Sequence, residues 1–532
     1  MTVSHAVVAM VVLAVAGALP TVALAGFRWL SVPAAPLAGA VLAALASAGC
    51  LAVGGTVLFW FVLLSAVAAA VSAVGWWRAH PAGSRPKLGS RPATGPRPAT
   101  EPRALPAGWA GPVGLITVVA ASAWMLTALR APSIGFDARA IWLLHADWLA
   151  AGHQVALGAL RNPAVPYSHD TYPPLPSGSV AVVWMVTGDH GYRLGQVVVA
   201  LLNSAAVATA ALATVEVGRR VAAVAGGATH WAGHRTVVPA VAGVVAAGAL
   251  VLAAFGVAGR FGTNGLADLL WSAAATGAIA FGLVLPGRGR DLGMAVLLLA
   301  VAGLTKDEGI AIGMAIAVLI TLRRAWSAWR STTPTALAGP GRWPWRSVPW
   351  KPLAAGGLGV LALGAWPVLM RVLGSAPALP TTGSGQGGWF RFRATYDAMV
   401  PYLHDVPLAV ALAVVGGVFL RRTRRAAGVG NDGWSWAAFV AGTGILLATY
   451  VTGTLNIQLW LLTSINRTVF FPELAVWWIV ATWAVVAVGQ VVAPLGDLRT
   501  SDPPPGPQAA SGPPVPALSA GRGGAGGTTH QP

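Results

Sequence analysis

Long apolar runs separated by short polar loops are the feature that most constrains the fold of this chain. Of its 532 residues, 56% are hydrophobic and only 9% are charged, whereas soluble domains carry about 25% charged residues. A helix needs roughly 20 apolar residues to cross a bilayer, and many of the runs reach that length. The sequence therefore predicts an all-α polytopic membrane protein.

We expect about 13 transmembrane helices on this length criterion. The run at 36–77 is too long for one helix, and its Gly54-Gly55 pair predicts a break into two. Residues 292–304 and 309–322 predict two unusually short helices joined by a charged turn. The other expected crossings are 5–26, 111–130, 191–217, 237–258, 267–286, 352–374, 405–420, 434–453 and 470–493.

Basic residues lie mainly in the short loops between these runs. In a soluble chain a net charge of +18 would favour nucleic-acid binding. This placement instead predicts positive-inside topology and contact with anionic lipid, with no nucleic-acid partner. The arginine clusters at 219–220, 323–324 and 421–425 place the N-terminus outside and the C-terminus inside. The single cysteine, Cys50, lies in an apolar run, so neither a disulfide framework nor a thiolate metal site is expected.

Composition divides the chain into four parts. Residues 1–77 are expected to form N-terminal accessory transmembrane helices, and residues 78–110 a basic, proline-rich cytoplasmic linker. Residues 111–493 carry the remaining spans and are expected to form the transmembrane core. Residues 494–532 are a Pro- and Gly-rich tail, for which we expect disorder on the cytoplasmic side.

Charge appears directly after the fourth expected span. Ile141, Leu144 and Trp148 recur there at helical spacing, which predicts a short amphipathic helix lying on the membrane surface. Asp137 opens this helix at the start of a long extracytoplasmic loop, residues 131–190, that carries further juxtamembrane helices. Two interpretations stay open, because Asp137 either caps the helix or belongs to a reaction site at the interface.

Ionisable residues gather at the outer ends of several separate spans in this topology. Each costs roughly 2.5–3.5 kcal/mol inside a membrane, so such residues are retained mainly for pairing or for function. Carboxylates beside Lys and Arg provide a place where a hydroxyl is deprotonated while a leaving phosphate is neutralised. The outer acidic residues are Asp137, Asp147, Asp170, Asp189, Asp268, Asp307, Glu308, Asp397 and Asp405, and the outer basic residues include Arg139, Arg193, Arg260, Lys306 and Arg467.

Four outer motifs follow one another along the chain. They are Gly135-Phe136-Asp137, Tyr172-Pro173-Pro174-Leu175, Asn264-Gly265-Leu266-Ala267-Asp268 and Lys306-Asp307-Glu308-Gly309, followed later by Leu462-Thr463-Ser464 and Arg467. In this order they resemble the GT-C superfamily of membrane glycosyltransferases, especially the group with protein mannosyltransferases and lipid A aminoarabinose transferases. The resemblance covers roughly residues 111–470, and the first three spans and the tail lie outside it.

The resemblance implies a GT-C-like fold with a long catalytic first loop. It also implies transfer of a sugar from a polyprenyl-phosphate donor to an envelope glycan, lipid or protein acceptor, with inversion at the anomeric carbon. Asp137 matches the first-loop acid and would be the general base, and Asp268 matches the second-loop acid that orients the acceptor or helps hold a metal. Lys306 and Arg467 would hold the lipid phosphate, with Arg193 as a weaker third cation. The other expected substrate-binding residues are Glu308, Tyr172, His169 and Asp170.

Cofactor use stays open at this point. The family's first loop often carries two adjacent acids, whereas Asp137 has no acidic neighbour. One alternative is a divalent cation, Mg²⁺ or Mn²⁺, held by Asp137 and Asp268, and the other is no metal. His169 and Asp170 could bind a metal or a sugar hydroxyl. The alternative is that they are two polar residues of a loop with no binding role. Trp142 fits stacking on a sugar or an interfacial aromatic belt.

Two other functions also stay open. A polytopic transporter or lipid flippase would show charges at the midplane, inverted repeats and interrupted helices. The charged joint at Lys306 is compatible with that function, but we find no repeat between the two halves. A structural partner in envelope assembly would leave the outer acids dispensable. In each case the sequence predicts a multi-pass protein of the inner (plasma) membrane, and a transferase site would lie on its extracytoplasmic face.

The predicted orientation can be tested by labelling single cysteines in a Cys50→Ala background. In intact cells an impermeant thiol reagent should label Val165→Cys and Gln458→Cys but not Gly95→Cys, because only the first two lie outside in this topology. Permeabilised cells, in which all three positions should react, provide the control. If Gly95→Cys were labelled and Val165→Cys were not, the true orientation would be the opposite of the predicted one.

Overall fold

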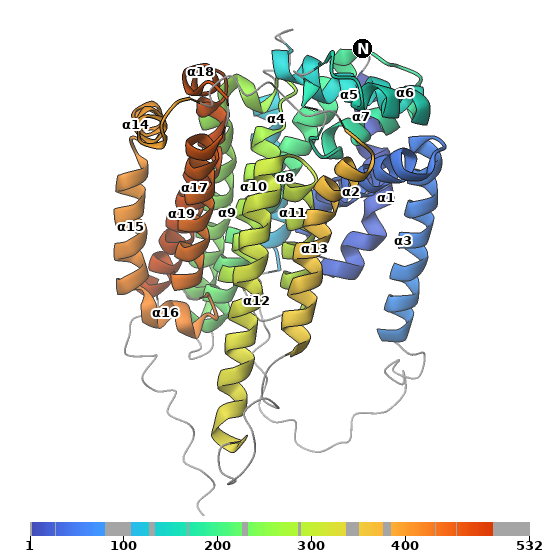
Figure 1. The fold of residues 1–532 in the computed structure, drawn as a ribbon. Coiled ribbons are helices and arrows are strands. Elements are labelled where there is room, and N and C mark those ends of the chain that lie inside the picture. Colours follow the sequence, from blue (N-terminus) through green and yellow to red (C-terminus); the bar gives the residue numbers. More distant parts are fainter. Residues whose placement is uncertain are drawn as a thin grey trace, which may run out of the picture. The chain divides into compact units, whose positions relative to one another are not determined.

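The computed structural model is predominantly helical in the residues that it describes, and no strand occurs among them (Figure 1). Apolar helices of membrane-spanning length make the chain an all-α polytopic membrane protein, with a lipid bilayer as its environment. The described residues are 3–26, 28–79, 108–126, 134–165, 168–169, 171–225, 232–285, 289–336, 350–375, 385–430, 432–453 and 455–492.

The N-terminal part of the chain consists of long apolar helices. They are α1 (Val3–Ala25), α2 (Ser31–Val53), α3 (Val57–Ala79) and α4 (Ala110–Leu126). The predicted break between α2 and α3 is confirmed: Gly54 and Gly55 have φ angles of +104° and +83°, a backbone region that residues with a Cβ rarely adopt. The helix therefore cannot continue through this pair.

Between α4 and the next long helix lie short helices that pack on the protein. They are η3 (Ala138–Leu143, a π-helix), α5 (Leu144–Ala151), α6 (His153–Leu160) and α7 (Leu175–Thr187). The helix predicted at the start of this segment is present, as η3 and α5, but part of its apolar side packs on protein and not on a membrane surface. Ile141 and Trp142 are buried, and η3 and α5 pack against α7, with η3 also touching α8. Protein therefore covers Ile141 and Trp142, whereas Leu144 and Trp148 are half-buried.

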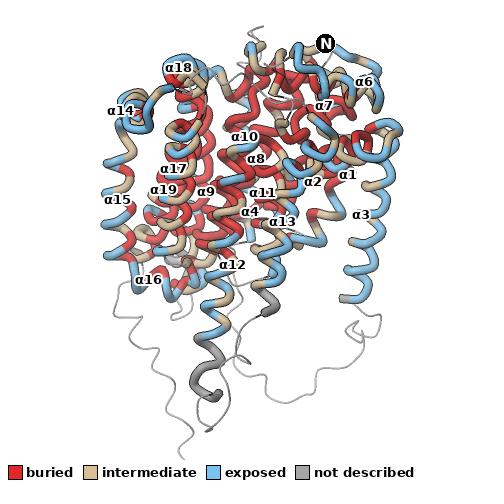
Figure 2. The backbone as a smooth tube through the Cα atoms, in the orientation of Figure 1, coloured by how far each residue is buried: buried red, intermediate tan, exposed pale blue. Residues whose placement is uncertain are grey.

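The buried centre of the bundle is α8 (Tyr192–Ala225). Of its 18 most apolar consecutive residues, 94% are buried, against 17% in α3, and Figure 2 shows the same contrast. Around α8 pack α4, α9, α10 and α19. The elements that follow α8 are α9 (Ala232–Ala258), η5 (Gly259–Gly262, a 3₁₀ helix), α10 (Asp268–Ile279), η6 (Ala280–Val284, a π-helix) and α11 (Gly289–Gly303).

The second half of the bundle corrects one predicted helix length. Helix α12 runs from Asp307 to Ala336, so only α11 of the expected short pair is short. The arginines taken as its end lie within it, and Arg323 donates to the carbonyl of Gly282. The later helices are α13 (Trp350–Val372), α14 (Gly388–Met399), α15 (Val406–Phe419), α16 (Arg421–Ala426), α17 (Asp432–Thr452), α18 (Ile457–Thr468) and α19 (Phe470–Val492).

Nine helices in the described part of the chain are long and apolar enough to cross a membrane. Shorter apolar helices include α4, α10 with η6, and α15, and every predicted crossing has a helix over it. The count of about 13 crossings therefore stays a prediction. In Figure 1, α5, α6, α14 and α18 lie at one end of the bundle and α16 lies at the other.

Candidate functional site

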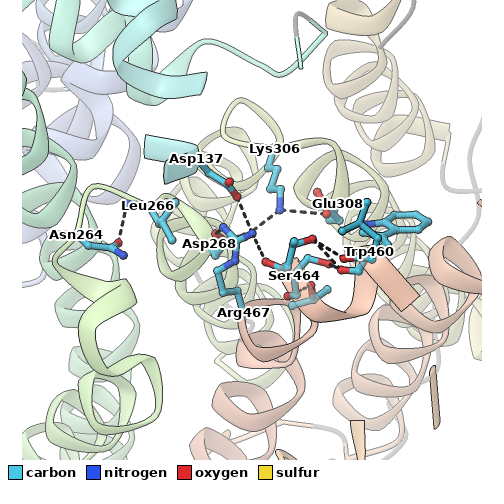
Figure 3. A network of polar contacts seen from close by, with 12 residues as sticks. Asp137, Asn264, Leu266, Asp268, Lys306, Glu308, Trp460, Ser464 and Arg467 are labelled. Atoms are coloured by element: carbon cyan, nitrogen blue, oxygen red, sulfur yellow. Dashed lines mark hydrogen bonds and ion pairs between the residues drawn. The ribbon is translucent and has the colours of Figure 1, made fainter. Parts of the chain in front are cut away.

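Four segments that are far apart in the sequence meet at the end of the bundle that carries α5 and α18 (Figure 3). Asp137 immediately precedes η3, and Asp268 is the first residue of α10. Lys306 and Glu308 lie at the joint between α11 and α12, and Arg467 lies in the last turn of α18. The structure thus brings together five of the residues that the sequence singled out.

Backbone hydrogen bonds join the motifs that carry these residues. The amide of Gly135 donates to the carbonyl of Asn264 at 2.9 Å, and the amide of Leu175 donates to the carbonyl of Leu304 at 2.8 Å. The first bond ties the Asp137 segment to the segment before Asp268. The second ties the Tyr-Pro-Pro segment to the joint that carries Lys306.

A glycine and a small apolar cluster fix the spacing beneath the charges. Gly265 has a φ of +91°, and a Cβ there would lie 3.0 Å from the Cβ of Ala138. Glycine therefore lets the two segments approach closely. Ile141 and Trp142 pack with Leu266 in one buried cluster that also contains Ala138. This packing fixes the distance between the segment that carries Asp137 and the segment that carries Asp268.

The five charged side chains form one continuous chain of ion pairs with alternating sign. Arg467 reaches Asp137 Oδ2 at 2.6 Å and Asp268 Oδ2 at 3.3 Å. Lys306 Nζ lies 2.9 Å from Asp268 Oδ1 and 3.2 Å from Glu308 Oε1. Three carboxylates thus face two cations, so the cluster has a net charge of −1 when all five are ionised.

Exposure differs sharply among the three carboxylates. The Asp268 side chain is 4% exposed and that of Glu308 is 15% exposed, whereas Asp137 is 31% exposed. Burial lowers the pKa of Lys306, but Asp268 and Glu308 outweigh that effect and raise it well above the usual value. Lys306 is therefore a fixed cation at any physiological pH. Asp137 is the carboxylate of the cluster that an incoming molecule can reach.

The contacts of Asp137 do not support the interpretation that its side chain caps the helix. Asp137 occupies the residue before η3, but its side chain makes no capping hydrogen bond. It contacts the Arg467 guanidinium instead. Capping therefore does not explain this acid. Lys306 pairs with Glu308 of its own turn as well as with Asp268 of α10, so ordinary charge pairing accounts for part of its position.

Aromatic side chains cover one side of the cluster. The Lys306 ammonium lies 5.7 Å from the centre of the Tyr172 ring, within the range of a cation–π contact. Tyr172 stacks on His169 at 4.7 Å and on Trp142 at 5.5 Å. Trp142 is 2% exposed, so it serves as packing beneath Tyr172 and does not present a face for a sugar.

The two histidines of this region are held neutral. Burial lowers the pKa of His169, and the charge of Lys306 lowers it further, against the opposing effect of Asp137. Burial, together with His169, lowers the pKa of His145 to about 3. Neither imidazole therefore carries charge near pH 7. His169 also has a φ of +51°, uncommon for a residue with a Cβ.

Of the other predicted residues, Tyr172 and His169 lie beside the ion-pair chain, and Arg193 contacts a residue of α8. Arg193 donates to Gln196, whose own amide donates to the carbonyl of Thr263, so Arg193 supports the loop before Asp268 from a distance. Asp170 lies outside the described residues. The sequence interpretation missed Gln196, whose signal was a polar side chain in an otherwise apolar helix.

Asn203 is a second buried amide that the sequence interpretation passed over. It lies on the same helix as Gln196, and its amide nitrogen donates to the carbonyls of Gly262 and Leu266, each at 3.0 Å. These two bonds clamp both ends of the loop that leads to Asp268. Here too the signal was an uncharged polar residue within a predicted span.

The arrangement of the acids does not fit a divalent cation. Both carboxylate oxygens of Asp268 already face a cation, one from Lys306 and one from Arg467. Within the described ranges, no three His, Cys, Asp or Glu side chains are grouped so as to hold a metal ion. A metal between Asp137 and Asp268 would have to displace Arg467, so no step below uses one.

Comparisons with known proteins identify no relative. No family model, no curated protein and no solved structure matches this chain. The resemblance carried by the motifs therefore stays an expectation.

A double-mutant cycle tests whether the charges act as one unit. Asp268→Asn and Lys306→Met should each lower the free energy of unfolding, by at most about 3–5 kcal/mol, because each removes one ion-pair partner from buried charges that keep another. The double variant should lose less than the sum, with a coupling of about 0.5–3 kcal/mol. Denaturation in detergent of the four proteins measures this.

The matched control for this cycle is the exposed pair of Arg393 and Asp397. Its atoms are 3.8 Å apart and its side chains are 76% and 64% exposed, so Arg393→Met and Asp397→Asn should show almost no coupling. Additive losses at Asp268 and Lys306 would contradict a coupled cluster.

Proposed function

We propose that this chain is a membrane glycosyltransferase of the GT-C type, which moves a sugar from a polyprenyl-phosphate donor to an envelope glycan, lipid or protein. The observation that carries the proposal is a partly exposed carboxylate, Asp137, held against a dense cluster of fixed charges. Inverting glycosyl transfer requires a base for the acceptor hydroxyl and cations near the leaving phosphate. Both are present within one chain of contacts.

Asp137 is the proposed general base. Arg467 holds Oδ2 of this carboxylate, which fixes its orientation. Asp137 accepts the proton of the acceptor hydroxyl as the acceptor oxygen bonds to the anomeric carbon. The bond from that carbon to the donor phosphate breaks at the same time, and the phosphate leaves with the electron pair as polyprenyl phosphate. Attack opposite the leaving group inverts the anomeric centre.

Lys306 and Arg467 are the proposed partners of the leaving phosphate. Charge on the phosphate oxygens grows as the glycosidic bond breaks, and fixed cations in a poorly hydrated site stabilise it without solvent reorganisation. Both side chains are only 8% exposed and are bound to carboxylates. Donor binding must therefore exchange at least one carboxylate contact for a phosphate contact, with Glu308 the more exposed partner of Lys306.

Tyr172 and His169 are proposed to line the substrate side of the cluster, because their stacked rings lie beside Lys306. Asp268 is proposed to position both cations, since it contacts each of them. The site is placed on the extracytoplasmic face of the inner membrane by the predicted positive-inside topology of about 13 crossings.

Replacement of Asp137 tests this function. Asp137→Asn keeps the size of the side chain and removes the base, so turnover with a labelled polyprenyl-phosphate sugar should fall by roughly 10²–10⁴-fold. Asp397→Asn, which removes an exposed acid elsewhere, is the matched control and should retain its rate. Membrane abundance and melting temperature show whether each variant folds. Normal turnover in folded Asp137→Asn protein would refute the assignment.

A polytopic transporter or lipid flippase is the second candidate. The observation in its favour is that both cations of the cluster are paired with acids. Paired charges of this kind inside a membrane also mark the pathways of transporters. The two functions differ in their product. A transporter would move a substrate across vesicles without forming a glycosidic bond.

A further inference from the structure

A large groove lies far from the charged cluster, between α1, α2, α4 and α8. It has a volume of about 800 Å³, within the roughly 300–1,000 Å³ range of ligand pockets. Most of its lining is apolar, with Val11 and Val15 from α1, Val32 from α2 and Val215 from α8. Val15 is 70% exposed. The α1 and α2 walls therefore face outward, toward the hydrocarbon of the bilayer, whereas Val215 is buried.

One end of this groove is cationic. Arg28, Arg219 and Arg290 line it together with a single acid, Glu216. Arg219 pairs with Glu216 at 3.0 Å, and the buried Asp291 behind them pairs with Arg28 at 3.0 Å.

A fourth arginine joins the two acids at this end. Arg220 reaches Asp291 at 2.7 Å and Glu216 at 3.3 Å. Four arginines thus stand against two acids, Glu216 and Asp291, which leaves a net charge of +2 at this end of the groove. The acids hold Arg28, Arg219 and Arg220 in place. Arg290 lines the groove without an ion pair to either acid among the described residues.

The position of the groove separates it from the proposed active site. Arg193, near the loop before Asp268, and Arg219, at the groove, lie on the same helix α8, 26 positions apart in the numbering. At a rise of 1.5 Å per residue this is about 39 Å. A molecule in the groove therefore cannot contact Asp137, and the groove needs an occupant of its own.

We propose that the groove binds one anionic diacyl phospholipid. Its phosphate would lie at Arg219 and Arg290, because guanidinium groups bind phosphate oxygens through paired hydrogen bonds. An acyl chain would lie along Val11, Val15 and Val32. The combination of apolar walls open to lipid and an excess of positive charge at one end matches an anionic headgroup on an apolar tail.

Charge argues against the chain's own linker as the occupant. Residues 78–110 carry Arg78, Arg85, Lys87, Arg91, Arg97 and Arg103 with one acid, Glu101. A segment with that excess of positive charge would be repelled by the arginines of the groove. A zwitterionic lipid would gain less from the excess charge than an anionic one.

Native mass spectrometry of the detergent-purified full chain tests the proposal, with phosphatidylglycerol and phosphatidylcholine titrated separately. Wild-type protein should bind one phosphatidylglycerol more tightly than phosphatidylcholine. Arg219→Gln/Arg290→Gln should weaken phosphatidylglycerol binding about 30-fold, because each basic residue near an anionic headgroup contributes roughly fivefold. Ala18→Phe, which fills the apolar part of the groove, should weaken binding of both lipids without changing charge.

The control removes two arginines elsewhere. Arg421→Gln/Arg422→Gln takes the same charge from exposed positions on α16 and should leave the affinity unchanged. Equal loss in this control, equal affinity for the two lipids, or unchanged binding in both groove variants would each overturn the proposal. Retention of a polyprenyl phosphate in preference to phosphatidylglycerol would show that the assigned occupant is wrong. Melting temperatures confirm that the variants are folded.

Discussion

The guanidinium of Arg467 is the group on which the charged end of the bundle depends. It contacts Asp137 and Asp268, which come from different segments, and donates to the carbonyl of Thr463 in its own helix at 2.7 Å. A planar guanidinium has five donors in a fixed fork, so it can hold all three partners at once. Lysine has no comparable fork. Without Arg467, no ion pair would link Asp137 to α10. Asp268 would keep a single ion-pair partner, Lys306.

Uncharged groups also hold together the segments that Arg467 joins. The backbone bond from Gly135 to Asn264 and the positive φ of Gly265 set the distance between two of the loops. Gln196 and Asn203 hold the second loop from the buried face of α8. The cost of burying charge is thus met by mutual pairing and by amide groups that fix the geometry. Such a pre-organised site suits a reaction in which charge moves.

The sequence predicted elements better than it predicted partners. Apolar run length and the Gly54-Gly55 pair were enough to locate α2 and α3, because bilayer thickness and glycine backbone freedom act locally. The extent of α12 was missed, since Arg323 marks where polar residues begin and a helix can continue past that point. Motif order indicated which charges share one end, but the choice of Asp268 as the partner of Lys306 depends on how α10 and α12 pack. The spacing of Ile141, Leu144 and Trp148 predicted a helix after Asp137, but it gave no sign that the first turns are a π-helix.

Glycosyl transfer by the purified wild-type chain is the most direct test of the central claim. The protein would be incubated with a panel of polyprenyl-phosphate sugars, labelled in the sugar, and a membrane extract as the source of acceptor. The account predicts that one donor yields a labelled product together with an equal amount of free polyprenyl phosphate, and that the new glycosidic bond has the opposite anomeric configuration. Retained configuration, or no product from any donor while the same preparation moves a lipid or solute across vesicles, would contradict it.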